Sequence, residues 1–270
     1  HLSTDDDGTE VILLYQIKNE PERRLPWVHS GLLQATLVTT LGAGALMAGE
    51  DPFGSRIFEV VGAAFPYPTT LDPATLWLGL TFASPFLGML ICHEMGHWYA
   101  ARHHQVRATL PYFIPFPPYF SVIGSLGAFI RLRSPSIRRS ILFDIGASGP
   151  LASLIVSLPM FAVGLEMSHA EAEPASLTSP FVIHFAGQSV WLGSSPVTHL
   201  FGSLFGPDGF GEALIHLHPF ALAGWLGLFV TALNLLPLGQ LDGGHVLYAL
   251  FPGRQERFAR LFFLALVPLG

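Results

Sequence analysis

The sequence predicts an all-α polytopic membrane protein, a helical bundle of about five or more spans with a re-entrant or interfacial β-hairpin between the second and third spans. Half of the 270 residues are hydrophobic and only 12% are charged, with a mean hydropathy of +0.49. A soluble domain typically carries about twice that charged fraction. Several apolar runs approach the ~20 residues that a helix needs to cross a bilayer. We therefore expect a lipid bilayer to surround most of the chain.

Four apolar runs are long enough to be spans, and a fifth begins near Phe258 and is cut off. The four runs cover about residues 28–48, 76–101, 143–165 and 218–238. On this basis we divide the chain into three parts. They are an N-terminal segment (1–27), a membrane-embedded core (28–250) and the start of a further, truncated span (251–270).

The basic residues predict how these spans are oriented. Lys and Arg precede the first span, follow the fourth, and gather in the 102–142 connection between the second and third. The connection from Glu166 to Ala213 contains no Lys or Arg. The positive-inside rule then places the N-terminus, the 102–142 connection and the 250s on the cytosolic side or its equivalent. The net charge of −6 is spread thinly and gives no reason to expect nucleic acid as a partner.

Two apolar stretches cannot be continuous helices. Residues 111–134, "PYFIPFPPYFSVIGSLGAFIRLRS", have four prolines in their first half, and proline breaks a helix. We expect their second half to form short strands around the Gly-Ser-Leu-Gly turn, which gives the hairpin. The other stretch, "TALNLLPLGQLDGGHVLYAL", is interrupted by one proline and three glycines. Broken membrane helices often mark a functional site, because they free backbone groups and admit polar side chains.

The strongest functional signal is "ICHEMGHWYA" at residues 91–100. Positions i and i+4 share one face of a helix, so His93 and His97 can bind the same metal ion. Neutral imidazole suits Zn²⁺, which in catalytic sites takes three protein ligands and leaves one position for water. Glu94 lies beside the first histidine, where a carboxylate can accept a proton from that water. Ionisable residues within a membrane are functional candidates by default, so we predict one zinc ion per chain.

A third zinc ligand is expected at the same depth in the membrane. Asp144 and Asp242 are the aspartates at the edges of predicted spans. Asp144 lies among arginines and can pair with one of them. Asp242 lies in the broken fourth helix, near its cytosolic end, and the glycines that follow let the backbone approach the metal closely. His97 lies about 7 Å below the cytosolic end of its own helix, so the depths agree and Asp242 is the stronger choice.

These motifs together resemble the site-2 protease family of intramembrane zinc metalloproteases. The resemblance rests on "HEMGH", on "NLLPLGQLDGGH" some 140 residues later, on "FDIGASGPLAS" and on "IGSLGAFIRLRSP", and it covers about residues 76–250. The last stretch resembles the membrane-associated β-hairpin of bacterial and chloroplast members. An inserted PDZ-sized domain is the one expected feature that this sequence lacks. The resemblance implies zinc ligands at His93, His97 and Asp242, a general base at Glu94, and a residue near the substrate backbone at Asn234.

The leading functional hypothesis is an intramembrane zinc metalloendopeptidase that cleaves transmembrane protein substrates in or near their spans. A substrate helix must unwind before attack, and we expect the edge of the 121–132 hairpin to pair with the unwound segment. The alternative is an ion or proton transporter or channel that uses the same His/Glu/Asp cluster. A transporter needs no base beside the first histidine, which favours the protease. An inactive scaffold is a third interpretation, and the intact motif argues against it.

Other polar residues have simpler interpretations. Asn234 can equally satisfy carbonyl groups freed by the helix break. His245 is assigned either to packing or to a supporting role near the site. Gly146, Gly149 and Pro150 are assigned to close helix packing. The histidines at positions 169, 184 and 199 are not expected to form a specific metal site, and those at 216 and 218 are placed at the far membrane boundary.

Overall fold

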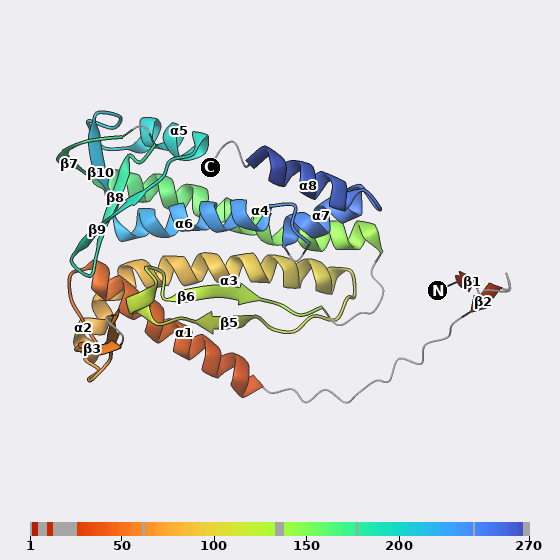
Figure 1. Cartoon of the computed structure of the whole chain (residues 1–270), viewed down its shortest axis with the longest axis horizontal. Helices are drawn as coiled ribbons and strands as arrows, with labels where there is room; N and C mark the ends of the chain where they lie inside the picture. Colours follow the sequence, from red (N-terminus) through yellow and green to blue (C-terminus); the bar gives the residue numbers. More distant parts are fainter. Residues whose placement is uncertain are drawn as a thin grey trace.

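The computed structural model describes residues 2–4, 10–12, 26–60, 63–132, 138–176, 178–239 and 241–266, and it is mostly helical with small sheets (Figure 1). The helices are α1 (Pro26–Met47), α2 (Pro73–Leu76), α3 (Leu80–His103), α4 (Arg139–Glu166), α5 (Pro196–Phe205), α6 (Pro219–Asn234), α7 (Asp242–Leu250) and α8 (Gln255–Leu266). Two 3₁₀ helices are η1 (Trp77–Gly79) and η2 (Pro118–Phe120). The strands are β1 (Leu2–Thr4), β2 (Glu10–Ile12), β3 (Arg56–Val60), β4 (Ala63–Tyr67), β5 (Tyr112–Pro115), β6 (Ser125–Phe129), β7 (His169–Pro174), β8 (Phe181–Phe185), β9 (Gln188–Leu192) and β10 (Ala213–His216).

Three helical segments within the described residues are long and apolar enough to cross a membrane. They are Trp27–Met47, Pro73–His103 and Arg139–Glu166, and they fall on the first three predicted spans. The second segment is longer than predicted because α2 and η1 lead directly into α3. Its start is capped by Asp72, whose side chain accepts a hydrogen bond from the backbone N–H of Ala74.

The fourth predicted span is shorter in the structure than in the sequence analysis. α6 ends at Asn234, and its 16 residues extend about 24 Å, less than the ~30 Å of a hydrocarbon core. The helix stops there because Pro237 disfavours helical backbone at the residue before it and offers no N–H. α7 begins only at Asp242. The predicted break in the fourth helix is therefore present, and it separates two helices.

α4 packs against α3, α6 and α7 (Figure 1). Small residues make the close approach possible. A Cβ atom at Gly96 of α3 would lie 2.5 Å from the backbone oxygen of Ser148 in α4. A Cβ atom at Gly224 of α6 would lie 2.5 Å from the backbone nitrogen of Phe161. Large buried side chains, among them Phe82, fill the space between these contacts.

The predicted hairpin region contains an antiparallel pair, β5 with β6, but its turn differs from the prediction. Ser125, Leu126 and Gly127, three residues of the expected four-residue turn, lie inside β6, and the connection consists of residues 116–124, which include η2. The prolines that exclude a helix fit an edge strand and a 3₁₀ turn, so the first half of the region supplies a strand. Residues 133 and 134 lie outside the described residues.

The connection after α4 corrects the all-α prediction. It forms a four-stranded sheet in the order β7-β10-β8-β9, together with α5. β8 and β9 are joined by Ala186 and Gly187, whose φ angles of 49° and 77° suit the two-residue type I′ turn of a hairpin. Phe181, Ile183 and Ile215 of this sheet belong to the main apolar core. Because these side chains are buried in the core, the connection is a folded unit. The absence of Lys and Arg, from which its side of the membrane was predicted, gives no sign of this fold.

Candidate metal centre

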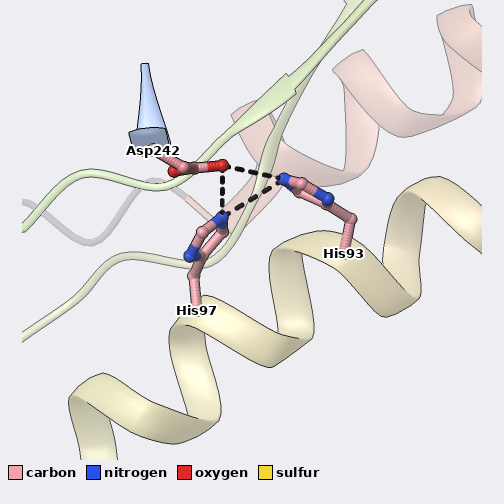
Figure 2. Close-up of side chains that lie close together, drawn as sticks. All are labelled: His93, His97 and Asp242. Carbon is pink, nitrogen blue, oxygen red and sulfur yellow. Dashed lines mark hydrogen bonds and ion pairs between the residues drawn. The ribbon is translucent and has the colours of Figure 1, made fainter. Parts of the chain in front are cut away.

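Three potential metal ligands from two helices meet at one point (Figure 2). His93 and His97 lie one turn apart on α3 and are 2% and 6% exposed. Oδ2 of Asp242, the first residue of α7, lies 3.4 Å from Nε2 of His93 and 3.2 Å from Nε2 of His97. The two Nε2 atoms lie 3.2 Å apart. We name His93, His97 and Asp242 the α3–α7 cluster.

The spacing of these atoms fits one zinc ion. Two ligand atoms bound to a tetrahedral Zn²⁺ at 2.0–2.1 Å lie about 3.3 Å apart, close to the three distances in the cluster. Nδ1 of His97 lies 2.6 Å from the carbonyl oxygen of Ile145. A carbonyl oxygen only accepts, so Nδ1 carries the proton and Nε2 presents its lone pair to the cluster. A lone pair and a carboxylate this close repel each other, and a zinc ion held between them would remove this repulsion.

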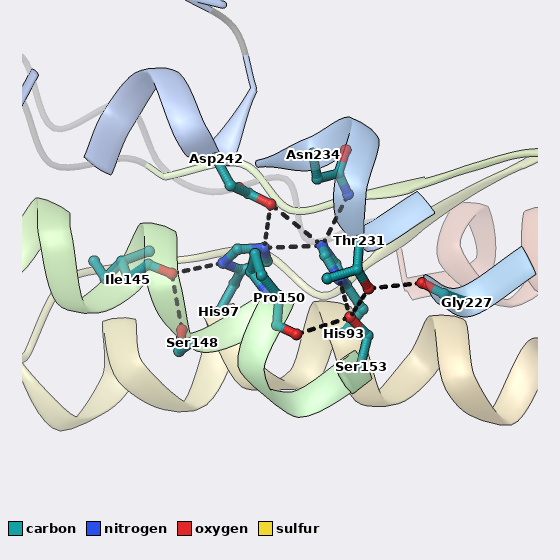
Figure 3. Close-up of polar contacts among 10 residues, drawn as sticks. All are labelled: His93, His97, Ile145, Ser148, Pro150, Ser153, Gly227, Thr231, Asn234 and Asp242. Carbon is teal, nitrogen blue, oxygen red and sulfur yellow. Dashed lines mark hydrogen bonds and ion pairs between the residues drawn. The ribbon is translucent and has the colours of Figure 1, made fainter. Parts of the chain in front are cut away.

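A hydrogen-bond network holds the ring of His93 (Figure 3). Its Nδ1 lies 3.1 Å from Oγ of Ser153 on α4. The Ser153 hydroxyl contacts Oγ1 of Thr231 on α6 at 2.7 Å and the carbonyl oxygen of Pro150 at 3.1 Å, and Thr231 donates to the carbonyl of Gly227. The network lets the Ser153 hydroxyl oxygen accept a hydrogen bond from the Nδ1–H group of His93. Such outer partners orient a ligand and fix its tautomer.

Ser153, Thr231 and the carbonyl of Ile145 support the ligands and were not predicted from the sequence. Gly149 was predicted only to allow helix packing, whereas it also makes room for the ring of His97. A Cβ atom at Gly149 would lie 2.0 Å from Nε2 of His97. The run "FDIGASGPLAS" contains both Gly149 and Ser153 and was the available sequence signal for these supporting groups. Whether the two residues face the ligands depends on how α4 is rotated against α3, which the run does not specify.

The start of α7 fits tightly against the break that precedes it. Cβ atoms at Gly243 and Gly244 would lie 2.1 Å and 2.0 Å from backbone oxygens of residues 235 and 238. The glycines thus let the chain turn closely enough for Asp242 to reach the histidines. The other candidate, Asp144, does not join the cluster, because its Oδ2 lies 2.8 Å from Nε2 of His104.

Glu94 and the three ligands line one cavity of about 560 Å³. Glu94 is 4% exposed, and the backbone N–H of Ile130 donates a hydrogen bond to its carboxylate. Residues 128–132, at the end of β6 and after it, form one wall of the cavity. His245 also lines it. The cavity therefore brings a buried carboxylate, the metal-binding atoms and an extended backbone segment to the same place.

Asn234 ends α6 next to the ligands. Its Nδ2 lies 3.2 Å from Nε2 of His93 (Figure 3). The side-chain amide is thus directed at the α3–α7 cluster, while the predicted alternative was a bond to a carbonyl freed by the helix break. An amide donor at this position is available to a group bound in the cavity.

Comparison with protein families matches residues 81–267 to Peptidase family M50. The match covers more than half of the chain and includes all of the cluster. The chain belongs to peptidase family M50. The resemblance to the site-2 proteases is thereby confirmed, and the α3–α7 cluster fits one zinc ion.

Relatives of this M50 chain carry the same class in their names. It is 34% identical over 246 residues to the probable zinc metalloprotease EGY1, chloroplastic, of Arabidopsis thaliana, covering 88% of this chain and 43% of the relative. It is 33% identical to the protein of that name from Oryza sativa subsp. japonica, over 64% of this chain and 28% of the relative. The chain thus spans less than half the length of these relatives. No solved structure matches it.

Proposed function

We propose that this chain is an intramembrane zinc metalloendopeptidase that hydrolyses peptide bonds in or near transmembrane segments of membrane proteins, in regulated intramembrane proteolysis. One observation carries the proposal. A zinc-fitting cluster and a buried glutamate line the same cavity among helices long and apolar enough to cross a membrane. A metal cluster and a glutamate that are buried among such helices suit a protein that acts on membrane-embedded chains. Membership of family M50 supports the peptidase class.

In this proposal the zinc ion is held by His93, His97 and Asp242. When bound, zinc lowers the pKa of a water ligand toward neutrality and polarises a carbonyl oxygen. Glu94 accepts a proton from the attacking water and delivers it to the nitrogen of the departing amine. The hydrogen bond from the Ile130 N–H holds the carboxylate beside the cavity, so that it does not have to be reoriented between the two proton transfers.

Asn234 is proposed to stabilise the oxyanion. Its amide nitrogen lies 3.2 Å from a ligand atom, so its N–H groups are near any carbonyl that approaches the metal. Donors that are already oriented toward a developing negative charge stabilise a transition state without reorganisation. The amide would donate to the substrate carbonyl oxygen as that oxygen gains charge.

The segment after β6 is proposed to bind the unwound substrate as an added strand. The backbone nitrogen and oxygen of Arg131 both bond to Thr109. Successive residues of an extended strand direct their backbone groups to opposite sides, so Ile130 and Leu132 direct theirs toward the cavity. The Ile130 bond to Glu94 agrees with this direction. A substrate paired here would present its amides beside the ligands.

Leu132 gives a cleaner test of strand addition than Ile130, because a proline at Ile130 also removes the bond to Glu94. Leu132→Pro should reduce substrate cleavage and substrate crosslinking. Leu132→Ala, which shortens the side chain and keeps the N–H, should preserve both. Equal behaviour of the two variants would exclude backbone pairing at this residue.

The membrane arrangement is also a proposal. The N-terminal segment 1–27 and the cavity opening lie on the cytosolic side or its equivalent, residues 28–250 form the embedded core with α6 as the fourth span, and 251–270 begin a further span. His97 lies five residues before Arg102, roughly 7 Å along the helix. Water then reaches the α3–α7 cluster without crossing the hydrocarbon core. Cysteine-accessibility labelling from each side of sealed vesicles tests the orientation.

The function is tested with the detergent-purified chain and single-span test substrates, with and without a zinc chelator, mapping any cut by mass spectrometry. The chain should cut within or beside the span, and the chelator should abolish the cut. Glu94→Gln should keep its zinc and lose cleavage by about 10²–10⁴-fold. Glu50→Gln, a change at an exposed glutamate, is the matched control and should cleave normally. Loss of zinc from Glu94→Gln would contradict the base role.

A further inference from the structure

The four-stranded sheet carries a polar group on the face away from the helices. Phe181, Ile183 and Ile215 lie on the core side. Successive residues of a strand point to opposite faces of a sheet. His184, next to Ile183 on β8, and His216, next to Ile215 on β10, therefore share the other face. Figure 1 shows this sheet at one end of the helix layer, with α7 toward the other end.

Strand pairing adds residues of β7 to the same face. His216 is paired in register with His169 on β7 and with Val182 on β8. Glu171 follows His169 by two residues, so it points to the same side as His169. Three neighbouring strands thus contribute one carboxylate and three imidazoles to a single face. These residues are up to 47 positions apart in the sequence, as His169 and His216 are, so no local sequence pattern predicts that they lie together.

The polar ends of these side chains lie close together on this face of the sheet. One ligand atom from each of Glu171, His184 and His216 lies within 4.8 Å of the others. Nε2 of His184 is 3.2 Å from Oε1 of Glu171, and the rings of His184 and His216 are stacked with centroids 4.8 Å apart. Nδ1 of His184 lies 3.3 Å from Oγ of Ser189. This outer bond leaves Nε2 facing the group, the arrangement that orients metal-binding histidines.

We propose that Glu171, His184 and His216, the sheet cluster, bind a second divalent transition-metal ion, with zinc as the best-suited metal. Two imidazoles and a carboxylate are a zinc donor set. A water, or His169, whose ring is tilted against that of His216 at a centroid distance of 4.8 Å, completes four-coordination. The ion connects β7, β8 and β10, so it stabilises the folded connection between α4 and α6.

This second site is separate from the proposed active site. Gly146, next to Asp242, and Glu166, at the end of α4 toward the sheet, are 20 residues apart on one helix, which corresponds to about 30 Å. The proposal goes beyond the proposed function and does not depend on it, because its readout is metal content and not cleavage.

The test measures zinc per chain by mass spectrometry of the metal, on detergent-purified full-length chain saturated with zinc and then dialysed. Wild type should hold two ions, and His184→Ala and His93→Ala one each. The double variant His93→Ala/His184→Ala should hold none. His199→Ala, a change at a histidine on α5 that is outside both clusters, should hold two. His184 is half exposed, so its replacement is expected to leave the fold intact, which circular dichroism and gel filtration check.

A second measurement uses the outer hydrogen bond. Ser189→Ala keeps all the ligands and should weaken zinc binding at the sheet cluster by about tenfold, measured by chelator competition in the His93→Ala background. One ion per wild-type chain, two ions in His184→Ala, or equal affinity with and without the Ser189 hydroxyl would each overturn the proposal. In the first of these cases Glu171 and His184 form an ion pair only. None of these outcomes changes the expectation for cleavage at the α3–α7 cluster.

Discussion

The α3–α7 cluster and the sheet cluster have the same chemical groups, two imidazoles and one carboxylate, but they are held differently. In the α3–α7 cluster the ligand atoms are 3.2–3.4 Å apart, and the outer ring nitrogens of both His93 and His97 are hydrogen-bonded. In the sheet cluster the side chain of His184 is 51% exposed. Ligands that are already oriented lose less freedom on binding. The buried α3–α7 cluster should therefore bind zinc more tightly than the sheet cluster.

The largest expected effect is the difference in zinc content and cleavage between substitutions at Asp242 and Asp144, the two aspartates at the predicted span edges. Asp242→Ala should empty the α3–α7 cluster and abolish cleavage, because two imidazoles alone do not complete a zinc site. The sheet cluster should keep its ion. Asp144→Ala loses only the pair with His104 and should retain zinc and cleavage. Metal content and substrate cleavage are measured for both variants, and full zinc content in Asp242→Ala would contradict the assignment.

A substitution that displaces the ring of His97 should have the next largest effect, a loss of zinc affinity. Gly149→Ala places a methyl carbon 2.0 Å from Nε2 of His97, so the ring must move. We expect zinc affinity at the α3–α7 cluster to fall by about 10–100-fold, measured by chelator competition. Gly88→Ala on α3 meets nothing within 4 Å and is the control. Unchanged affinity in Gly149→Ala would mean that the ring position is not required.

Removal of an outer hydrogen bond should have a smaller effect. Ser153→Ala removes the partner of His93 Nδ1 and should weaken zinc binding by roughly tenfold. Ser157→Ala, one turn further along α4, is a matched control, because its hydroxyl is buried without a hydrogen-bond partner within the described residues. If both variants bind zinc equally, the greater order of the buried cluster does not come from its hydrogen bonds.

A change distant from both clusters should affect stability alone. Burial acts to raise the pKa of Asp51, but hydrogen bonds from Ser55, Tyr119 and Phe53 outweigh it and lower the pKa below its ordinary value. A lowered pKa gives stability that is present above the unfolded-state pKa and is lost as pH falls through the folded one. Asp51→Asn should lower the melting temperature by a few degrees at neutral pH and less in acid. Metal content should not change, and a change would show coupling to a cluster.

The two clusters also differ in how far the sequence predicts them. The spacing of His93 and His97 is local, because one helical turn fixes which residues share a face. Asp242 could be selected because one proline and three glycines mark the broken helix around it. Ser153 and Thr231 meet across α4 and α6, and their contact depends on the rotation of each helix, which apolar periodicity does not fix in a helix that is apolar all round.

The sheet cluster depends on strand register and was not predicted. β10 pairs antiparallel with β7 and parallel with β8, and no local pattern specifies both partners. The absence of Lys and Arg between Glu166 and Ala213 indicated only the side of the membrane. The alternation in "FVIHFAGQSVWL" with its Ala-Gly turn was the available signal for β8 and β9, and it predicts one hairpin without the cluster that His216 completes.

Zinc K-edge X-ray absorption on the His184→Ala chain, which isolates the α3–α7 cluster, tests whether His93, His97 and Asp242 bind one zinc ion. We expect one zinc ion per chain with two imidazole nitrogens and one or two oxygens at about 2.0–2.1 Å. Replacement of Asp242 by alanine should remove this signal. A spectrum without imidazole scattering, or one that persists unchanged after His93→Ala, would contradict the account.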